Sequence, residues 1–140
     1  WTDDEANPQY ANLKAAYDVL SEATDAKGRK FEIHKIPIPA ILHISKEQSE
    51  GVDICESAAS REDGLPLAVT YINSYFVNGG LLVPQYDDPM DEAACDIFRK
   101  IMPEREIIKI YTKEWSMCGG NIHCMALQQP DPAAIAAMKK

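Results

Sequence analysis

A turn signal between two apolar runs constrains the fold of this chain more than any other feature. Asn78-Gly79 separates residues 69–77 from residues 81–84, and both runs are rich in apolar side chains. Because Asn-Gly readily adopts the positive φ angles of a tight turn, this pattern predicts a β-hairpin in the middle of the chain.

A helix and a further strand are predicted after the hairpin. Asp87-Asp88-Pro89 is a typical helix start, and Pro103 is a typical stop. Residues 106–111 then carry the pattern of a strand. Cys95 lies on the apolar face of the predicted helix, and the apolar stripe on that face consists of Ala94, Ile97, Phe98, Ile101 and Met102.

The first part of the chain repeats this order of patterns. Apolar residues recur at helical spacing over 8–23, and residues 30–37 alternate as in a half-buried strand, with a shorter strand expected at 41–44. An aspartate pair precedes each helix, at 3–4 and at 87–88, and we interpret both pairs as helix caps. Helix and strand thus form an internal repeat, which indicates an α/β fold of blades or stacked units.

Two segments stand apart from this alternation. Residues 45–66 are polar and without a period, so they predict a long surface loop. The alanine-rich end after Pro130 predicts a short helix. With 140 residues the chain can bury a core, and we expect a single domain over 1–140.

Charge and hydropathy narrow the range of partners. Fourteen basic and 22 acidic residues give a net charge of −8, which argues against nucleic acid and suits a cationic small molecule. No apolar run reaches the roughly 18 residues of a membrane span, and the acidic start does not resemble a signal peptide. The four cysteines form no CxxC pair, so we expect free thiols in a cytoplasmic protein without a membrane partner.

The stretch 115–130 holds the candidate reactive residue. Gly119 and Gly120 have no Cβ, so the backbone there can approach a ligand closely. Cys124 follows in a short run that can form a buried strand, where its thiol can serve as a nucleophile. On a strand, His123 would point to the opposite face, which makes it a poor proton donor for that thiol.

Other polar residues allow more than one interpretation. A free cysteine packs as a small hydrophobic residue more often than it reacts, so Cys124 alone would favour a structural thiol. The spacing of Cys118, His123 and Cys124 matches no recognised zinc pattern, and we expect no metal. Asn73, between two tyrosines, can hydrogen-bond either a buried loop or a ligand, and both interpretations stay open.

The segment Gly119-Gly120-Asn121-Ile122-His123-Cys124 resembles the Gly-Gly-Gly-Asn-Ile-His-Cys segment of the agmatine deiminase family. These enzymes are relatives of the bacterial-type peptidyl-arginine deiminases, and the segment carries their nucleophilic cysteine. Further similar segments, in the same order as in the family, are 1–4, 25–31, 35–39, 71–75, 78–84 and 128–130. The resemblance therefore covers most of the chain.

The resemblance implies a fold and a reaction. The fold is a five-bladed α/β propeller of the guanidine-modifying (pentein) type, of which this chain would supply about the last two blades. The reaction is hydrolysis of agmatine to N-carbamoylputrescine and ammonia through a covalent amidino-cysteine, without a cofactor. Cys124 would be the nucleophile, and Gly119, Gly120 and Asn121 would shape the guanidinium pocket. The family often forms homodimers, which adds a second copy to the expected partners.

The sequence also departs from the family pattern. The family's carboxylates and its acid-base histidine lie in an Arg-Asp and a His-x-Asp segment, upstream of the matched region. None of His34, His43 and His123 is followed two residues later by Asp. Cys118 stands where the family usually has the first of three glycines. We therefore expect a C-terminal fragment that is inactive alone, with a peptidyl-arginine or free-arginine deiminase, or a truncated non-catalytic copy, as alternatives.

Overall fold

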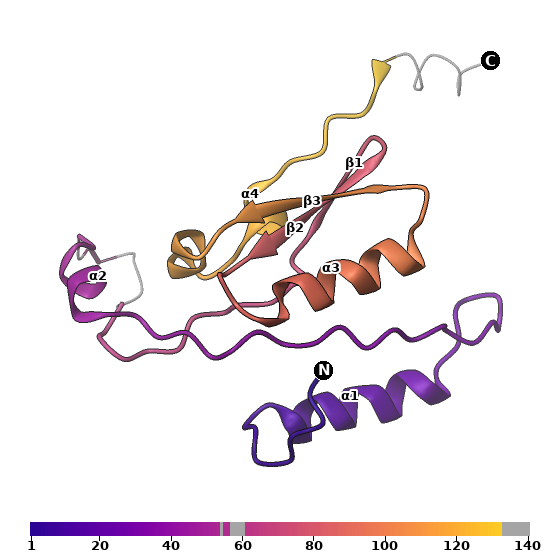
Figure 1. The fold of residues 1–140 in the computed structure, drawn as a ribbon, viewed down its shortest axis with the longest axis horizontal. Coiled ribbons are helices and arrows are strands. Elements are labelled where there is room, and N and C mark those ends of the chain that lie inside the picture. Colours follow the sequence, from indigo (N-terminus) through magenta and orange to yellow (C-terminus); the bar gives the residue numbers. More distant parts are fainter. Residues whose placement is uncertain (54, 57–60, 133–140) are drawn as a thin grey trace.

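The computed structural model describes residues 1–53, 55–56 and 61–132 (Figure 1). The elements, in chain order, are α1 (Tyr10–Glu22), α2 (Lys46–Glu50), β1 (Tyr75–Val77), β2 (Gly80–Gln85), α3 (Met90–Ile101), β3 (Glu106–Tyr111), the 3-10 helix η1 (Glu114–Cys118) and α4 (Ile122–Met125). The alanine-rich end, where a short helix is expected, lies outside the described residues beyond Pro132. In the described part of the chain, no helix is long and apolar enough to cross a membrane.

The predicted hairpin is confirmed, with a shorter first strand. β1 and β2 are antiparallel, and Val77 pairs with Gly80 across a turn in which Gly79 has a φ of 75°. Residues 69–74 do not join the sheet, because hydrogen bonds that involve side chains fix this segment instead of backbone pairing. Tyr71 is fully buried and donates a hydrogen bond from its hydroxyl to Asp91, while the Thr70 N–H is bound by the Tyr86 hydroxyl.

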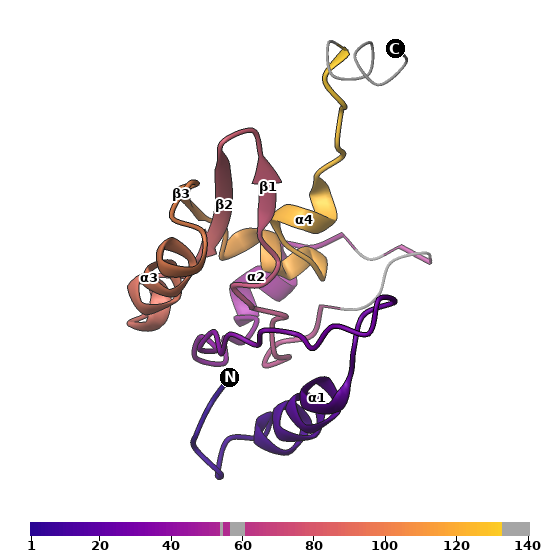
Figure 2. The ribbon, with the colours of Figure 1, turned by 90° about the vertical axis from the view of Figure 1, so that its right-hand side faces the viewer.

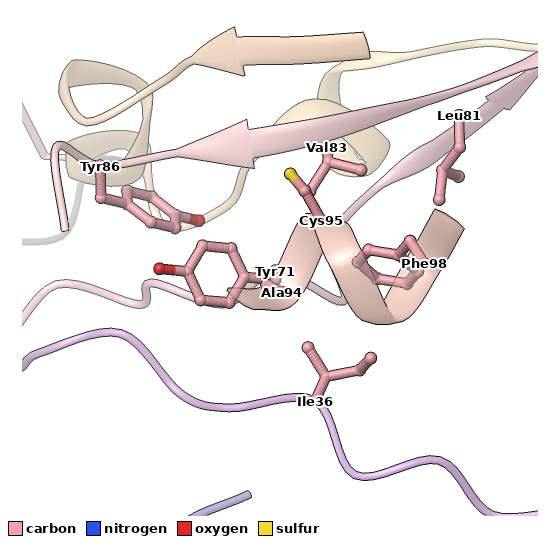
Figure 3. Close-up of a cluster of buried hydrophobic side chains, with 8 residues drawn as sticks. All are labelled: Ile36, Tyr71, Leu81, Val83, Tyr86, Ala94, Cys95 and Phe98. Carbon is pink, nitrogen blue, oxygen red and sulfur yellow. The ribbon is translucent and has the colours of Figure 1, made fainter. Parts of the chain in front are cut away.

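The predicted helix and strand after the hairpin are also confirmed. β3 pairs with β2 in parallel, from Gly80 opposite Glu106 to Gln85 opposite Tyr111, and α3 is the crossover that parallel strands need. The α3 residues that face the core are Ala94, Cys95 and Phe98, and Figure 3 shows them beside Leu81, Val83, Tyr86, Tyr71 and Ile36. Figure 2 shows α3 and α4 on opposite sides of this sheet.

The first part of the chain differs from the prediction. α1 forms within the predicted range 8–23, but no strand forms over residues 30–37 in the structure, and Lys30 makes only an isolated bridge to Thr24. The segment runs extended past α3 and attaches through the side chain of Ile36, which is buried in the core. Likewise, within 41–44 a single bridge joins His43 to Pro66. The prediction of an internal repeat is therefore wrong in its first half, where no strand forms over residues 30–37.

Two local predictions need correction at helix starts. The expected loop 45–66 contains α2, which begins with a capping box: Ser45 Oγ accepts from the Gln48 N–H and Gln48 Oε1 accepts from the Ser45 N–H. The second aspartate pair is not the cap of its helix, because the N-cap residue of α3 is Pro89; Asp88, one position earlier, accepts with Oδ1 from the N–H of Met90, the first residue of α3. The first aspartate pair does not cap α1, whose N-cap residue is Gln9.

Candidate active site

Cys124 lies on the short helix α4 rather than on a buried strand, so that prediction is wrong. The N-cap residue of this helix is Asn121, whose Oδ1 accepts from the Ile122 N–H at 2.8 Å and whose backbone carbonyl accepts from the Met125 N–H at 3.2 Å. Ile122 is buried, whereas Cys124 is exposed. Successive residues on a helix are turned by about 100°, so His123 and Cys124 do not point to opposite faces.

The two glycines before α4 serve different purposes. Gly119 ends η1 with a φ of 82°, a left-handed conformation that a side chain would strain. Gly120 lies against the Cys124 side chain, because a Cβ at this position would be 2.7 Å from Cys124 Cβ and 2.9 Å from its Sγ. The close approach seen at Gly120 is thus to the Cys124 side chain, and the predicted close approach of these glycines to a ligand stays a prediction.

Asn121 faces the interior of the protein. Its side chain is fully buried, and Nδ2 donates to the Tyr86 hydroxyl at 3.1 Å and to Ser116 Oγ at 3.3 Å. With Oδ1 engaged at the start of α4, the whole amide is used within the fold. Asn121 thereby determines where the loop and the first turn of α4 lie.

The Tyr86 hydroxyl joins this loop to a distant segment. It donates to the Thr70 carbonyl at 3.0 Å and accepts from the Thr70 N–H at 3.1 Å as well as from Asn121. One donor and two acceptors are all that a phenol offers, so the hydroxyl is fully used. Burial raises the pKa of Tyr86, which keeps this proton in place. Residues 70–73 are thus held beside the loop that leads into α4.

Asn73, in that segment, contacts the candidate nucleophile Cys124. Its Nδ2 lies 3.1 Å from Cys124 Sγ, and its Oδ1 accepts from the His123 N–H at 2.9 Å. The sequence leaves open a buried loop or a ligand as the partner of Asn73, whereas its contacts in the structure are with two exposed residues of the short helix α4. The sequence gives no local signal for this contact, because 51 positions separate Asn73 from Cys124.

These hydrogen bonds change the acidity of the thiol. The pKa of Cys124 lies below its usual value, chiefly because Asn73 donates to the sulfur and secondarily because the backbone of Asn121 does so. A donor stabilises the thiolate more than the neutral thiol, since hydrogen bonds to charged groups are stronger. The thiolate is the reactive form of cysteine, so the site favours nucleophilic chemistry.

A shallow depression lies next to the thiol. Its volume is about 520 Å³, and Thr70, Ile72, Asn73 and His123 line it. The His123 ring packs edge-on against Tyr75 at a centroid distance of 5.9 Å. In residues 1–53, 55–56 and 61–132, no three His, Cys, Asp or Glu side chains gather as metal ligands would.

Arg61 is a further residue near the site that the sequence patterns do not single out. Its Nε donates to the Met117 carbonyl at 2.5 Å. This hydrogen bond connects the described segment that begins at residue 61 to η1. The Arg61 Nη2 atom would lie 3.9 Å from a Cβ on Gly119. Arg61 therefore lies against the end of η1 at Gly119 and supports the turn there.

Comparison with known protein families matches residues 1–130 to the Porphyromonas-type peptidyl-arginine deiminases. The chain belongs to this family. The resemblance seen in the sequence is thereby confirmed, and it extends over the segments that form the sheet, α3 and the Cys124 loop.

Similar members of the deiminase family are named agmatine deiminases. The protein from Pseudomonas aeruginosa (strain LESB58) is 45% identical over 132 residues, which are 94% of this chain and 36% of that protein. The chain therefore spans little more than a third of the length of such relatives, 36% in this case. The solved structure of the agmatine deiminase of Enterococcus faecalis superposes with a TM-score of 0.87 at 34% identity, over 94% of this chain and 36% of that one.

A second solved agmatine deiminase also superposes on this chain. It is a cysteine-to-serine variant of C. jejuni agmatine deiminase with substrate bound, with a TM-score of 0.63 and 26% identity over 86% of this chain and 29% of that one. The α/β architecture of this chain is thus shared with solved agmatine deiminases.

Proposed function

We propose that this chain supplies the nucleophile of an agmatine deiminase, which hydrolyses agmatine to N-carbamoylputrescine and ammonia. The observation that carries the proposal is the exposed Cys124 thiol, which accepts a hydrogen bond from Asn73 at 3.1 Å. The lowered pKa of this thiol suits a nucleophile for a poor electrophile such as a guanidinium carbon. Relatives at 45% identity over 94% of the chain carry the name agmatine deiminase, which supports the choice of substrate.

The reaction proceeds in two steps at Cys124. In the first, the thiolate attacks the guanidinium carbon and a C–S bond forms. The bond from that carbon to a terminal nitrogen then breaks, and this nitrogen takes up a proton and leaves as ammonia. In the second step water adds to the carbon of the cationic amidino-cysteine and gives up both of its protons as the carbonyl group forms. The C–S bond breaks, its electron pair stays on sulfur, and the ureido product leaves.

Two kinds of group must complete this site. Carboxylates must hold the guanidinium in a bidentate fork, and a proton donor must assist the departing ammonia. The groups seen to hydrogen-bond Cys124 are amides, from the Asn73 side chain and the Asn121 backbone, and amides do not transfer protons at neutral pH. We therefore assign the missing groups to the family's Arg-Asp and His-x-Asp segments, and we expect the 140-residue chain alone to be inactive.

We further propose that the chain forms about two blades of a five-bladed α/β propeller. The β2–α3–β3 unit supports this, because α3 returns the chain to the same sheet as a blade requires. Gly119, Gly120 and Asn121 would shape the guanidinium pocket through the backbone of their loop. A homodimer, a cytoplasmic location, the lack of a cofactor and the lack of nucleic-acid or membrane partners stay predictions.

The test is ureido-product formation from agmatine by the full-length protein, with Cys124→Ser as the control. We expect turnover by the wild type and none by the variant, because Cys124 is the thiol that Asn73 contacts. Retention of most activity in the variant would contradict the assignment. Turnover by the isolated 140-residue chain would show that the missing acid and carboxylates lie within it or come from a second copy.

The same assay separates the alternatives. Free arginine and a peptidyl-arginine substrate are compared with agmatine, since the family description names peptidyl-arginine deiminases. Preference for either of these would replace agmatine as the substrate while leaving the role of Cys124 unchanged. A full-length protein that turns over none of the three would favour a non-catalytic copy.

A further inference from the structure

We propose that Asp91, in the first turn of α3, is a positioning residue for the Cys124 thiol and acts through the hydroxyl of Tyr71. Tyr71 lies two positions before Asn73, whose amide contacts the sulfur at 3.1 Å. Asp91 thus acts at a distance, by determining where that amide lies. The proposal rests on the proposed function only to the extent that Cys124 is the nucleophile.

The Asp91 carboxylate accepts hydrogen bonds from three parts of the chain. Oδ1 accepts from the Tyr71 hydroxyl at 2.7 Å, and Oδ2 accepts from the backbone N–H of Tyr86 at 3.1 Å and of Asp88 at 3.2 Å. Tyr86 directly follows β2, and Asp88 lies in the turn before α3. Hydrogen bonds to an ionised acceptor are roughly twice as strong as those between neutral groups. One carboxylate therefore joins the end of β2, the start of α3 and the segment that leads into β1.

The contact with Tyr71 goes beyond what the start of a helix needs. An acidic residue in the first turn of α3 is favourable for the helix dipole, and its backbone contacts fit that purpose. The Tyr71 side chain, however, is fully buried, and a buried hydroxyl must find an acceptor. Burial and the hydrogen bond to Asp91 raise the pKa of Tyr71, so its hydroxyl keeps the proton that it donates.

The thiol depends on this anchor because residues 70–73 are held at few points. Thr70 is fixed by its two hydrogen bonds to the Tyr86 hydroxyl, and Tyr71 by Asp91. Without the second anchor the segment can shift, and a hydrogen bond weakens as its atoms separate or lose alignment. The amide of Asn73 would then stabilise the thiolate less, which raises the pKa of Cys124.

The charge of Asp91 has a direct effect of the opposite sign. A carboxylate disfavours a nearby anion, so removing its charge alone would lower the pKa of Cys124. Loss of positioning raises that pKa instead. Asp91→Asn removes the charge and leaves one oxygen, which cannot accept both from the Tyr71 hydroxyl and from the backbone N–H groups on the other side. The sign of the shift in this variant therefore distinguishes positioning from a simple charge effect.

Alkylation of Cys124 by iodoacetamide as a function of pH measures the acidity of the thiol without any turnover. The full-length protein carries Cys55→Ser and Cys118→Ser, which removes the other exposed thiols of the described residues and leaves Cys95, which is buried. Because no substrate is involved, the result is independent of whether agmatine is turned over. A failure of the proposed function and a failure of this inference are thus separate outcomes.

Two variants and a matched control are compared in this background. Asp91→Asn changes the acceptor, and Tyr71→Phe removes the donor hydroxyl while the carboxylate and the buried ring stay in place. Tyr71→Phe changes no charge, and it carries the test should Asp91→Asn fail to fold. Asp96→Asn is the control, because it makes the same chemical change on the same helix, at an exposed side chain that pairs with Arg99.

We expect the midpoint of the Cys124 alkylation profile to rise by about half a pH unit in Asp91→Asn and in Tyr71→Phe, as for weakening of one hydrogen bond to an exposed anion. In Asp96→Asn the midpoint should stay the same or fall slightly. When Asn73→Ala is also present, neither variant should raise the midpoint further, since the donor through which both act is gone. An unchanged or lowered midpoint in the folded variants, or an equal rise on top of Asn73→Ala, would overturn the proposal.

Discussion

Gly120→Ala is the perturbation with the most direct structural consequence. The new methyl group would lie 2.7 Å from Cys124 Cβ and 2.9 Å from Cys124 Sγ. Carbon atoms in contact are separated by about 3.5–4.0 Å, so one of the two residues must shift by roughly 1 Å. The displaced atoms would be those of Cys124, because it is exposed on a four-residue helix, whereas Asn121 beside Gly120 is buried and bound to Tyr86.

The cost of this shift should appear in activity rather than in stability. A displacement of about 1 Å of a reacting group can reduce turnover by about 100-fold, and moving Sγ would also lengthen its 3.1 Å contact with Asn73. Overpacking costs about 1–3 kcal/mol in a rigid core, and an exposed helix can relax, so we expect about 1 kcal/mol in the free energy of unfolding.

Gly119→Ala provides the matched comparison for this variant. A methyl group there would meet Arg61 Nη2 at 3.9 Å, an ordinary contact, but the φ of 82° would be strained by about 1–2 kcal/mol. We therefore expect Gly119→Ala to lose more stability and less activity than Gly120→Ala. Ureido-product formation from agmatine measures the activity of each full-length variant, and denaturant unfolding measures its stability. Wild-type turnover in Gly120→Ala would refute the argument from the close contact.

Three further outcomes follow from the site. Tyr86→Phe removes the acceptor of the Asn121 amide and the Thr70 N–H, so denaturant unfolding should show a loss of about 1–3 kcal/mol, and a loss within error would contradict the role of this hydroxyl. The lowered pKa of Cys124 means that its thiolate persists to lower pH than in a free cysteine. Its alkylation should therefore decline only as the pH falls through that lowered value, and a profile like that of free cysteine would count against it. Cys118→Gly should leave agmatine turnover largely intact, because this exposed residue occupies a position where the family usually has glycine; loss of turnover would reveal a role for its thiol.

The parts of the fold that could be predicted are those that local signals determine. The Asn78-Gly79 turn and the apolar stripe of α3 specify their elements without help from distant residues. The strand expected over 30–37 fails because alternation alone does not provide a neighbouring strand, and in the structure Ile36 attaches by its side chain instead. The sequence does not identify α4 as a helix, because four residues are too few for periodicity to distinguish a helix from a strand.

The residues of the candidate site also fall into two groups, those that a local motif indicates and those that only distant contacts bring together. Cys124 and the glycines can be proposed from their motif, because the candidate reacting atom and the glycine beside it belong to adjacent residues. Asn73 cannot, because its contact with Cys124 exists only after the sheet and the loop have come together.

This dependence on distant residues follows from the size of α4. Four residues cannot maintain a helix in water, because helix nucleation is unfavourable and isolated helices shorter than about 12–15 residues are marginal. The direction of the Cys124 side chain must therefore come from contacts outside the helix: Asn121 at its start, anchored by the buried Tyr86 hydroxyl, and Asn73 at its side. Both contacts involve residues 70–73, directly through Asn73 and indirectly through the Tyr86 hydroxyl, which donates to the Thr70 carbonyl. This segment is joined to α3 because the Tyr71 hydroxyl donates to Asp91. Exposure gives the thiol access to substrate, and the core beneath it supplies the rigidity that such an exposed helix lacks.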